Sequence, residues 1–330
     1  MKTMLLRHAA VALMVGSMLV SAPVAEATTC PATPEAFARL KSRVLHPDPK
    51  HIVVVAHRAC HSTAPENTPQ AIETCWKMGV EVVENDVRLT RDGHMVIFHD
   101  DEISRMTDKW GYVEDQTLAA LRQARLKERS GEAGTYLTDQ PITTVEDYFA
   151  AIKNKVMVNY EIKASGAQFV AMFNDSVALA RRMGVLDHII FKIPDLKSHG
   201  KTTAKHILQS LVVPDDVMIM PIIWESDTPF ENRVNELEAY KGIGYELPFQ
   251  HQAYVAPLSN DPRLGRKATM MIALQPYWSG GLDDRLAARD PDAAWGRLID
   301  LGADLIMTDR PETLVSYLER KGLRRTVCDN

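Results

Sequence analysis

The chain has 330 residues, of which 45% are hydrophobic and 25% are charged, and its formal net charge is −5. These fractions are those of an ordinary globular protein, and the acidic balance leaves no basic surface of the kind that binds nucleic acid. The four cysteines lack the close spacing of a zinc site, which excludes a metal centre built from cysteine.

The first 27 residues have the pattern of a secretory signal peptide. Lys2 and Arg7 precede a hydrophobic run over residues 9–20, and the small-residue sequence AEA ends at residue 27. A bilayer takes about 20 residues to span, so this run is short for a membrane helix, although an uncleaved anchor is the alternative. We expect cleavage after Ala27, a single domain over residues 28–330, no stable membrane insertion, and a periplasmic or secreted location.

After this segment, hydrophobic runs typical of buried strands alternate with stretches of helical periodicity. The expected strands cover residues 51–56, 80–89, 94–98, 156–162, 188–193, 217–223, 269–274 and 305–307. The expected helices cover residues 33–45, 68–78, 143–152, 168–183, 202–211, 230–240, 295–301 and 311–318. Three other segments are a hairpin-like turn at 90–93, a polar stretch at 100–140 with one short helix near Leu118, and a short extended piece at 244–247.

This alternation predicts parallel strands that are buried on both faces. Eight main strands suit an α/β fold, the TIM (β/α)8 barrel, in which the polar stretch is a small insertion after the third strand. The alternative is an open doubly wound sheet, but no glycine-rich dinucleotide loop follows the first strand.

Ionisable side chains stand at the ends of four consecutive predicted strands. They are His57 and Arg58, Glu84 and Asp86, His99 and Asp100, and Glu161 and Lys163. Catalytic groups of a barrel lie at the carboxyl ends of its strands, and residues two apart on a strand point to the same side. The structural alternative for any one pair is a solvated charge or a salt bridge, but together they indicate a site.

Glu84, Asp86 and Glu161 would repel one another at one barrel mouth unless a cation lay between them. Ligands that are all oxygen suit a hard divalent ion, Mg²⁺ or Ca²⁺. His57 and His99 on neighbouring strand ends can act as an acid and a base.

Arg58 and Lys163 could hold an anionic group such as a phosphate. A metal, two imidazoles and two cations together favour phosphodiester chemistry over acyl transfer.

Four segments resemble the glycerophosphodiester phosphodiesterase family: HRACHSTAPENT, VENDVRLTRDGHMVIFHD, YEIKA and LIMTDRPE, at residues 57–68, 83–100, 160–164 and 305–312. The resemblance implies a TIM barrel, one divalent metal, and hydrolysis of a small glycerophosphodiester to glycerol 3-phosphate and an alcohol. It further implies roles for seven residues. These are His57 and His99 as the acid–base pair, Glu84, Asp86 and Glu161 as metal ligands, and Arg58 and Lys163 as phosphate contacts. Apart from the resemblance, Trp278 is a candidate pocket residue because it lies beside the Ser-Gly-Gly run at residues 279–281.

The sequence departs from the family pattern at three places. Ala59 stands where many members have glycine, and Asn85 replaces an apolar residue between the two carboxylates of its strand. Asn85 should face the helix layer, where its amide needs a partner. Residues 274–285 replace a Trp-Thr pair that usually ends the seventh strand, so the preferred alcohol does not follow from the resemblance.

Two other functions remain open. A related lyase would stop at a cyclic phosphate, and a non-catalytic periplasmic protein would only bind the diester. The LIMTDRPE segment favours the hydrolase over the lyase, and the presence of both histidines favours an enzyme over a binding protein.

Several remaining residues receive structural interpretations. Residues 66–68 and 309–311 are expected to begin helices, and Trp224 and Tyr277 are expected to pack. We expect a disulfide between Cys30 and Cys328, which lie near the two chain ends, and a free, buried Cys75.

Overall fold

The computed structural model describes residues 32–195, 203–259 and 267–325. The strands are β1 (Val53–Ala56), β2 (Val82–Leu89), β3 (Met95–Ile97), β4 (Thr143–Thr144), β5 (Met157–Ile162), β6 (Ile189–Ile193), β7 (Met218–Pro221), β8 (Gly244–Leu247), β9 (Ala268–Ile272) and β10 (Leu305–Thr308). The α-helices are α1 (Pro34–Leu45), α2 (Pro69–Lys77), α3 (Leu118–Leu121), α4 (Val145–Ile152), α5 (Gly166–Met183), α6 (Ala204–Ser210), α7 (Phe230–Leu237), α8 (Gln252–Val255), α9 (Asp284–Ala287), α10 (Arg297–Asp300) and α11 (Pro311–Arg320). Shorter 3₁₀ or π-helical segments are Val113–Asp115, Leu186–His188, Ala256–Ser259, Pro276–Trp278 and Asp292–Gly296.

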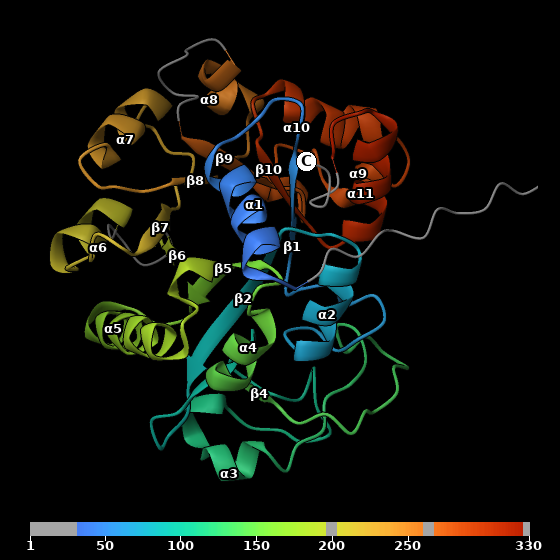
Figure 1. The fold of residues 1–330 in the computed structure, drawn as a ribbon, viewed down its shortest axis with the longest axis vertical. Helices are drawn as coiled ribbons and strands as arrows, with labels where there is room; N and C mark the ends of the chain where they lie inside the picture. The colour runs from blue at the N-terminus through green and yellow to red at the C-terminus, as the bar shows by residue number, and fades with distance from the viewer. Residues whose placement is uncertain (1–31, 196–202, 260–266, 326–330) are drawn as a thin grey trace, which may run out of the picture.

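Eight parallel strands of the described chain form a nearly closed barrel, as the TIM-barrel prediction requires. Their order is β7-β6-β5-β2-β1-β10-β9-β8, and each neighbouring pair along this path is parallel. A parallel bridge between Ile222, just after β7, and Glu246 of β8 brings the two ends of the path together. The helices lie outside the ring of strands (Figure 1).

The membership of the barrel differs from the prediction at one strand. Residues 94–98 are not a barrel strand, because β3 pairs antiparallel with β2 in a hairpin. Only five residues, 90–94, separate β2 from β3, which allows only an antiparallel return, since a parallel crossover takes a dozen residues or more. The short extended piece at residues 244–247 is β8 and supplies the remaining barrel strand. The insertion follows β3 as predicted, although β3 itself lies beside the barrel.

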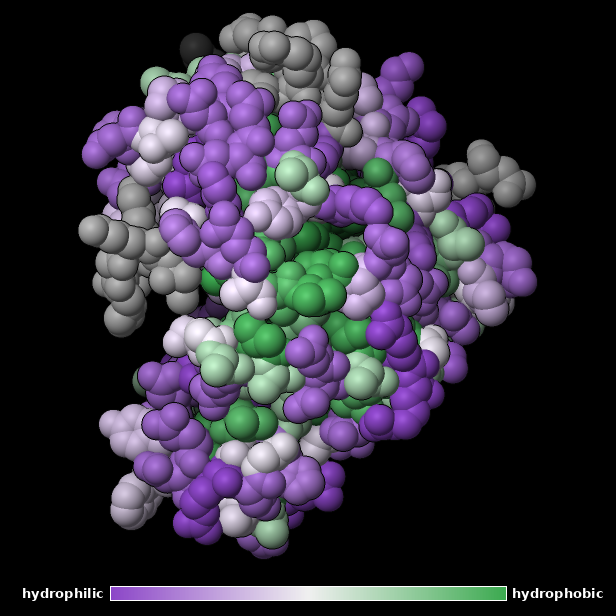
Figure 2. Space-filling view, turned by 90° about the vertical axis from the view of Figure 1, so that its left-hand side faces the viewer, coloured by the Kyte–Doolittle hydropathy of each residue, from purple (hydrophilic) through white to green (hydrophobic). Residues whose placement is uncertain are grey.

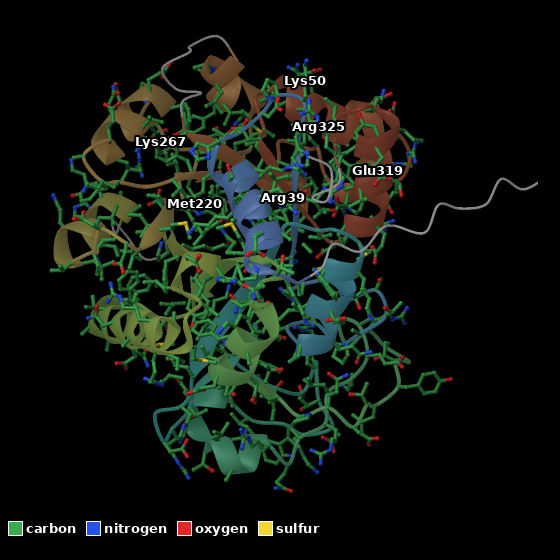
Figure 3. The ribbon with its side chains drawn as sticks, in the orientation of Figure 1. Arg39, Lys50, Met220, Lys267, Glu319 and Arg325 are labelled. Carbon is green, nitrogen blue, oxygen red and sulfur yellow. A yellow bond between two sulfur atoms is a disulfide. The ribbon has the colours of Figure 1, made fainter. Side chains whose placement is uncertain are left out.

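The barrel interior is closed at one end by α1. Phe37, Leu40 and Val44 of α1 form one buried cluster with side chains from the barrel strands, among them Met220 of β7 (Figure 3). Helix α1 lies across the ring of strands in Figure 1. Thr33 begins this helix, because its hydroxyl accepts a hydrogen bond from the backbone nitrogen of Ala36 at 3.2 Å.

The insertion has a small hydrophobic core of its own. That core contains Val96, Phe98, Ile103, Met106, Val113, Leu121, Ala124, Leu126 and Ile142. The segment forms the lower part of the molecule in Figure 1, with α3 at its tip. Because β3 folds back along β2, its carboxyl end returns to the level of Asp86, whose carbonyl accepts a hydrogen bond from Phe98 at 2.9 Å. The β2–β3 hairpin therefore places His99 at the barrel mouth.

The described cysteines are paired, so the prediction of a free Cys75 is wrong. Cys75, on the buried face of α2, forms a disulfide with Cys60 in the loop after β1. Cys30, Cys328 and the predicted signal peptide lie outside the described residues, so those predictions remain untested.

The outer surface is mixed in character. Figure 2 views the side that carries α5, α6 and α7 and shows hydrophobic residues gathered in the middle of that face, with hydrophilic residues around them. Within the described ranges, no helix combines the length and hydrophobicity that crossing a membrane requires.

Candidate active site

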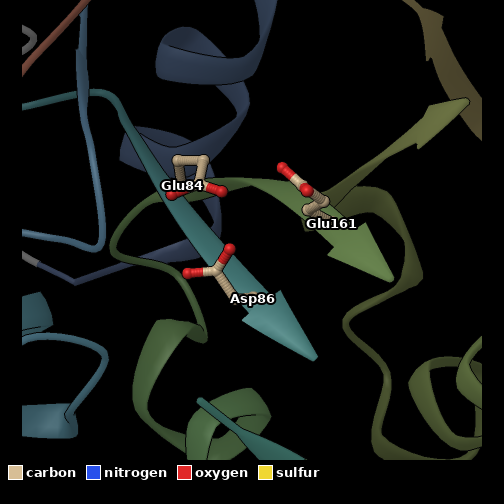
Figure 4. Close-up of side chains that lie close together, drawn as sticks. All are labelled: Glu84, Asp86 and Glu161. Atoms are coloured by element: carbon tan, nitrogen blue, oxygen red, sulfur yellow. The ribbon is translucent and has the colours of Figure 1, made fainter. Parts of the chain in front are cut away.

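Three carboxylates from two neighbouring strands meet at one end of the barrel (Figure 4). Glu84 and Asp86 alternate along β2 and so face the same side, and the parallel register sets Asp86 beside Glu161 of β5. One oxygen from each of the three lies within 4.8 Å of the others. Glu84 and Asp86 are buried, so the spacing argument from the sequence correctly brought these residues together.

The cluster fits a divalent cation. All of its donors are carboxylate oxygens, which are the ligands that Mg²⁺ and Ca²⁺ prefer. Oδ1 of Asp86 is buried and lies 3.0 Å from Nζ of Lys163, but it accepts no hydrogen bond of good geometry from the described residues, so this oxygen can still contact a second cation.

Two lysines lie among the carboxylates. Nζ of Lys163 is 3.0 Å from Asp86 and also contacts Glu161. Nζ of Lys192, in β6, lies 2.9 Å from Glu161 and 3.4 Å from Glu84. Burial opposes ionisation of Glu161, but the two lysines outweigh it and lower the pKa of Glu161 to about 2. Burial also opposes ionisation of Asp86, yet Lys163 and other nearby cations hold its pKa well below the usual range. These two carboxylates are therefore ionised at neutral pH, as metal ligands must be.

Lys192 and Glu246 are site residues that the sequence reading missed. Glu246, in β8, lies 3.4 Å from Lys192. Burial raises the pKa of Glu246 to about 7, against the attraction of Lys192. Each residue interrupts a short apolar strand, in the sequences IIFKI and GYEL. A charge inside a buried strand is uncommon and is the signal that could have identified both.

His57 follows β1, and its hydrogen-bond partner Asp309 follows the neighbouring strand β10. Its Nδ1 donates to Asp309 Oδ1 at 2.7 Å, because an ionised carboxylate can only accept. Its Nε2 lies 4.0 Å from Glu84. Burial lowers the pKa of His57, but the hydrogen bond to Asp309 and the charge of Glu84 outweigh burial and give a raised pKa. The last helix does begin at Pro311 as predicted, but Asp309 just before it is also the partner of a candidate catalytic histidine.

Asp284 fixes the backbone that carries Asp309. The hydroxyl of Thr308 donates to its two oxygens at 2.8 and 2.9 Å, and the backbone nitrogen of Asp309 donates at 2.8 Å. The indole nitrogen of Trp295 donates at 3.0 Å. Because Asp284 is buried, these contacts hold the end of β10 in one place and so position Asp309 against His57.

His99 is held by a chain of ion pairs from the insertion. Its Nδ1 donates to Asp100 at 2.6 Å. Arg105 donates to Asp100 at 2.5 and 3.2 Å and to the buried Glu66 at 2.6 Å. Arg58 donates to both oxygens of Glu66 at 3.2 Å. The buried Glu66 therefore binds both Arg105, which supports the partner of His99, and Arg58, which follows His57.

The loop after β1 has an unusual backbone. Arg58, Ala59 and Asn67 all have positive φ, at 52°, 64° and 60°. Ala59 therefore occupies a left-handed conformation that glycine adopts without steric cost, which explains why glycine is common at this position of the family pattern. The turn directs the backbone nitrogen of Arg58 to Glu84 at 3.1 Å. Thr68 caps α2 as predicted, and Asn67 donates to Asp86 at 3.1 Å.

Asn85 faces away from the carboxylates, as predicted from its alternation with Glu84 and Asp86. Its neighbours on the same face, Val83 and Val87, belong to the core between strands and helices. Asn85 is fully buried, and neither its amide nitrogen nor its oxygen finds a hydrogen-bond partner among the described residues. The partner expected for this amide is therefore not supplied by those residues.

A cavity of about 720 Å³ opens over the carboxylates. Seven of the eight predicted site residues line it: His57, His99, Glu84, Asp86, Glu161, Lys163 and Trp278. Arg58 is the exception, because its guanidinium contacts Glu66 and lies 3.8 Å from Asp86. Trp224 and Tyr277, which the sequence reading treated as packing residues, also line this cavity.

A second cavity of about 840 Å³ lies between the insertion, α5 and α6. It shares Glu161, Lys163 and Pro194 with the first, but neither His57 nor His99 lines it. The carboxylates and both histidines meet only in the first of these two cavities, which is therefore the candidate active site.

Comparison with known families gives two matches. The model of the glycerophosphoryl diester phosphodiesterase family matches residues 57–211. A model for a domain of unknown function matches residues 219–318. Both matched segments contribute strands to the same barrel.

Comparison with curated proteins gives matches of different lengths. An uncharacterized protein of Bacillus subtilis, YqiK, is 26% identical over 81% of this chain and 99% of its own length. A glycerophosphodiester phosphodiesterase of Caldanaerobacter subterraneus is 35% identical over 34% of this chain. That match spans 45% of the relative's length, so the chain matches about half of this enzyme.

Solved structures match over most of their length. A glycerophosphoryl diester phosphodiesterase from Parabacteroides distasonis has a TM-score of 0.64 at 19% identity, covering 86% of this chain and 92% of that one. A phosphodiesterase from Oleispira antarctica, solved with the product sn-glycerol-3-phosphate, has a TM-score of 0.60 at 22% identity, covering 81% and 96%. At these identities the likeness supports the fold.

Proposed function

The chain belongs to the glycerophosphodiester phosphodiesterase family, and from that premise we propose that it hydrolyses small glycerophosphodiesters to glycerol 3-phosphate and an alcohol. The observation that carries this proposal is the meeting of three carboxylates and two histidines in one cavity. The relative from Oleispira antarctica, which holds glycerol 3-phosphate as its product, supports the choice of a small-molecule substrate.

Glu84, Asp86 and Glu161 would hold one divalent cation, Mg²⁺ or Ca²⁺. When bound, such an ion supplies positive charge that stabilises the phosphoryl oxygens in the transition state. Lys163, which lies beside Asp86, adds a fixed positive charge at the same edge. Arg58 is the second candidate phosphate contact, and its guanidinium would have to extend past Asp86 to reach the cavity.

His57 and His99 would move the protons. One imidazole takes a proton from the attacking oxygen, the bond between phosphorus and the alcohol oxygen breaks, and the other imidazole returns a proton to that oxygen. Each histidine binds an aspartate through Nδ1, so Nε2 is the nitrogen left for the substrate. The attacking oxygen belongs either to water or to the neighbouring glycerol hydroxyl, and in the second case water then opens a cyclic phosphate to the monoester.

The lyase alternative would stop at that cyclic phosphate, and a binding protein would leave the diester intact. The LIMTDRPE segment supports the hydrolase, because it resembles the hydrolase family at this position and the lyases have a different C-terminal signature. Both histidines line the cavity with the carboxylates, which favours an enzyme over a binding protein.

Export to the periplasm or the medium is proposed from residues 1–27. The disulfide between Cys60 and Cys75 fits an oxidising compartment.

A substrate panel tests the proposal. Purified protein is incubated with glycerophosphocholine, glycerophosphoethanolamine and glycerophosphoglycerol, and both products are quantified. We expect the wild type to release glycerol 3-phosphate and alcohol in equal amounts. The control variant Glu319→Gln, at the periphery of the molecule (Figure 3), should have the same turnover. Glu161→Gln should lose most of that turnover. Unchanged turnover in Glu161→Gln would contradict the metal-ligand role, and no product from any diester would contradict the function.

A further inference from the structure

Three aromatic side chains form one wall of the candidate active site. This aromatic wall consists of Trp224, which follows β7, and of Tyr277 and Trp278, which follow β9. The ring centre of Trp224 lies 6.1 Å from that of Tyr277 and 6.5 Å from that of Trp278. The planes meet at 47° and 75°, so the rings turn toward one another and do not stack in parallel. Tyr277 is 56% exposed, which places the wall at the mouth of the cavity, above the buried carboxylates.

The backbone holds this wall in place. The nitrogen of Trp224 donates to the buried Asp195 at 3.4 Å, and its carbonyl accepts from the hydroxyl of Tyr254 at 3.4 Å. The carbonyl of Trp278 accepts from the backbone nitrogen of Phe249 at 3.1 Å. Two loops from different parts of the chain are thus fixed beside each other at one opening.

The wall offers little to a headgroup rich in hydroxyls. Among the described residues that line the cavity there is no serine, threonine, asparagine, glutamine or arginine. The residues around the aromatic wall are apolar: Ile222, Pro248 and Leu274. Against these side chains the Tyr277 hydroxyl and the two indole nitrogens are the polar groups within reach, so a polyol would replace only part of the hydrogen bonds that it loses to water.

The aromatic faces favour a cation at the same place. The carboxylates of the lining do not supply this preference, because Glu84, Asp86 and Glu161 are assigned to the divalent cation and Asp195 pairs with Arg233 at 2.8 Å. Aromatic faces attract cations, and they suit a quaternary ammonium group in particular because that group cannot donate a hydrogen bond. Lys163 lies with the carboxylates, at the proposed phosphate position.

We propose that Trp224, Tyr277 and Trp278 bind a quaternary ammonium group, so that the preferred leaving alcohol is choline. This inference rests on the proposed diesterase function and adds the specificity of the same site. Anionic phosphate would lie over the carboxylate-bound cation and Lys163, and the trimethylammonium group would lie against the aromatic wall.

The first test compares substrates of equal shape and different charge. The 3,3-dimethylbutyl ester of glycerol phosphate replaces the ammonium nitrogen of glycerophosphocholine with carbon. We expect kcat/KM of the wild type to be about tenfold higher for the choline ester than for this neutral ester, and higher than for glycerophosphoglycerol. Equal rates on the charged and neutral esters would overturn the inference while leaving the diesterase function intact.

The second test changes the wall. Trp224→Ala and Trp278→Ala should each lower kcat/KM for the choline ester by about tenfold and for the neutral ester by less than about threefold. Trp224→Phe should retain part of the preference, and Trp110→Ala, at an 85% exposed tryptophan outside the cavity, should retain all of it. An equal loss on both esters would indicate a structural role only and would contradict the proposal.

Binding alone separates this inference from the proposed function. Choline and 3,3-dimethylbutanol are titrated into the wild type and followed by tryptophan fluorescence. Tighter binding of choline, reduced in Trp224→Ala, is expected whether or not any diester is hydrolysed. Equal affinity for the two alcohols would overturn the inference.

Discussion

His57 and His99 each pair Nδ1 with an aspartate and line the same cavity. A general acid or base contributes about 10²- to 10⁴-fold to rate, so His57→Ala and His99→Ala should each lower kcat by that order. Steady-state kinetics on glycerophosphocholine measure the change, with circular dichroism to confirm folding. His94→Ala, at an exposed histidine of the β2–β3 hairpin, is the matched control and should be unaffected. A folded His99→Ala variant with normal turnover would remove that residue from the mechanism.

Asp309 accepts a hydrogen bond from Nδ1 of His57, so we expect it to act through that histidine. In Asp309→Asn the carboxylate that accepts from Nδ1 is replaced by an amide, which no longer fixes the tautomer with Nε2 free. We expect kcat to fall by about 10²- to 10⁴-fold with a smaller change in KM. Asp216→Asn, in an exposed ion pair with Arg181, should behave as the wild type. Normal kcat in Asp309→Asn would show that the pairing with His57 has no catalytic role.

At the residue scale, the sequence was informative where alternation along a strand brings side chains together. Glu84, Asp86 and Glu161 were correctly predicted to converge because residues two apart on a strand share a face. Glu66 and Asp309 were read only as helix starts, because local patterns carry no information about long-range partners. Each makes its decisive contact with a residue elsewhere in the fold.

The β2–β3 hairpin shows where prediction of elements succeeded and failed. The short turn between the two strands was recognised, but the strand after it was still counted in the barrel. The apolar pattern of β3 arises because it packs on the insertion core, which contains Val96 and Phe98. Strand β8 was underestimated because it has only four residues, one of which is the charged Glu246, so its sequence is hard to distinguish from that of a loop. Hydrophobic pattern alone does not distinguish a barrel strand from a neighbouring hairpin.

The disulfide between Cys60 and Cys75 ties the loop after β1 to α2. Residues 57, 58, 66 and 67 of this loop reach the site, so the crosslink restrains their backbone. In the chain-entropy model a closed loop of this length contributes about 3 kcal/mol. Replacing both cysteines with serine should therefore lower the free energy of unfolding by about that amount, measured by chemical denaturation.

A reducing agent supplies the control for this prediction. It should destabilise the wild type by more than the double variant, in which the predicted bond between Cys30 and Cys328 is the only one left to reduce. Equal stability of the oxidised wild type and the double variant would show that the crosslink does not restrain the loop.

At the scale of the whole molecule, one buried ion cluster joins the start of the barrel to the end of the chain. Glu81, just before β2, contacts His51 and Arg324, each at 3.0 Å. Burial opposes ionisation of Glu81, but Arg324 and His51 outweigh it and lower its pKa to about 2. The cluster holds together segments far apart in sequence.

This cluster predicts a loss of stability in acid. The pKa of Glu81 is lower in the folded state than in the unfolded chain, so its contribution is complete above the ordinary value and is lost as the pH falls toward 2. The full contribution is about 3 kcal/mol, of which about 2 kcal/mol is lost by pH 3. Denaturation at pH 6 and pH 3 should show a smaller decline for Glu81→Gln than for the wild type. Equal declines would contradict the assignment.

The overall architecture was predictable because alternating strands and helices leave few other folds, and the described chain does form the barrel. The proposed preference for choline was not predictable from the sequence. Trp224 and Trp278 are 54 positions apart in the sequence, and only the barrel brings their loops to the same opening.

Phosphorus NMR of the products formed from glycerophosphocholine tests the central claim most directly. We predict a single new monoester resonance, that of glycerol 3-phosphate, which does not form in excess chelator and forms again when Mg²⁺ or Ca²⁺ is restored. A cyclic phosphate that persists at long times without monoester would contradict the hydrolase. Full monoester formation in chelator, with no metal found by elemental analysis, would contradict a cation held by Glu84, Asp86 and Glu161.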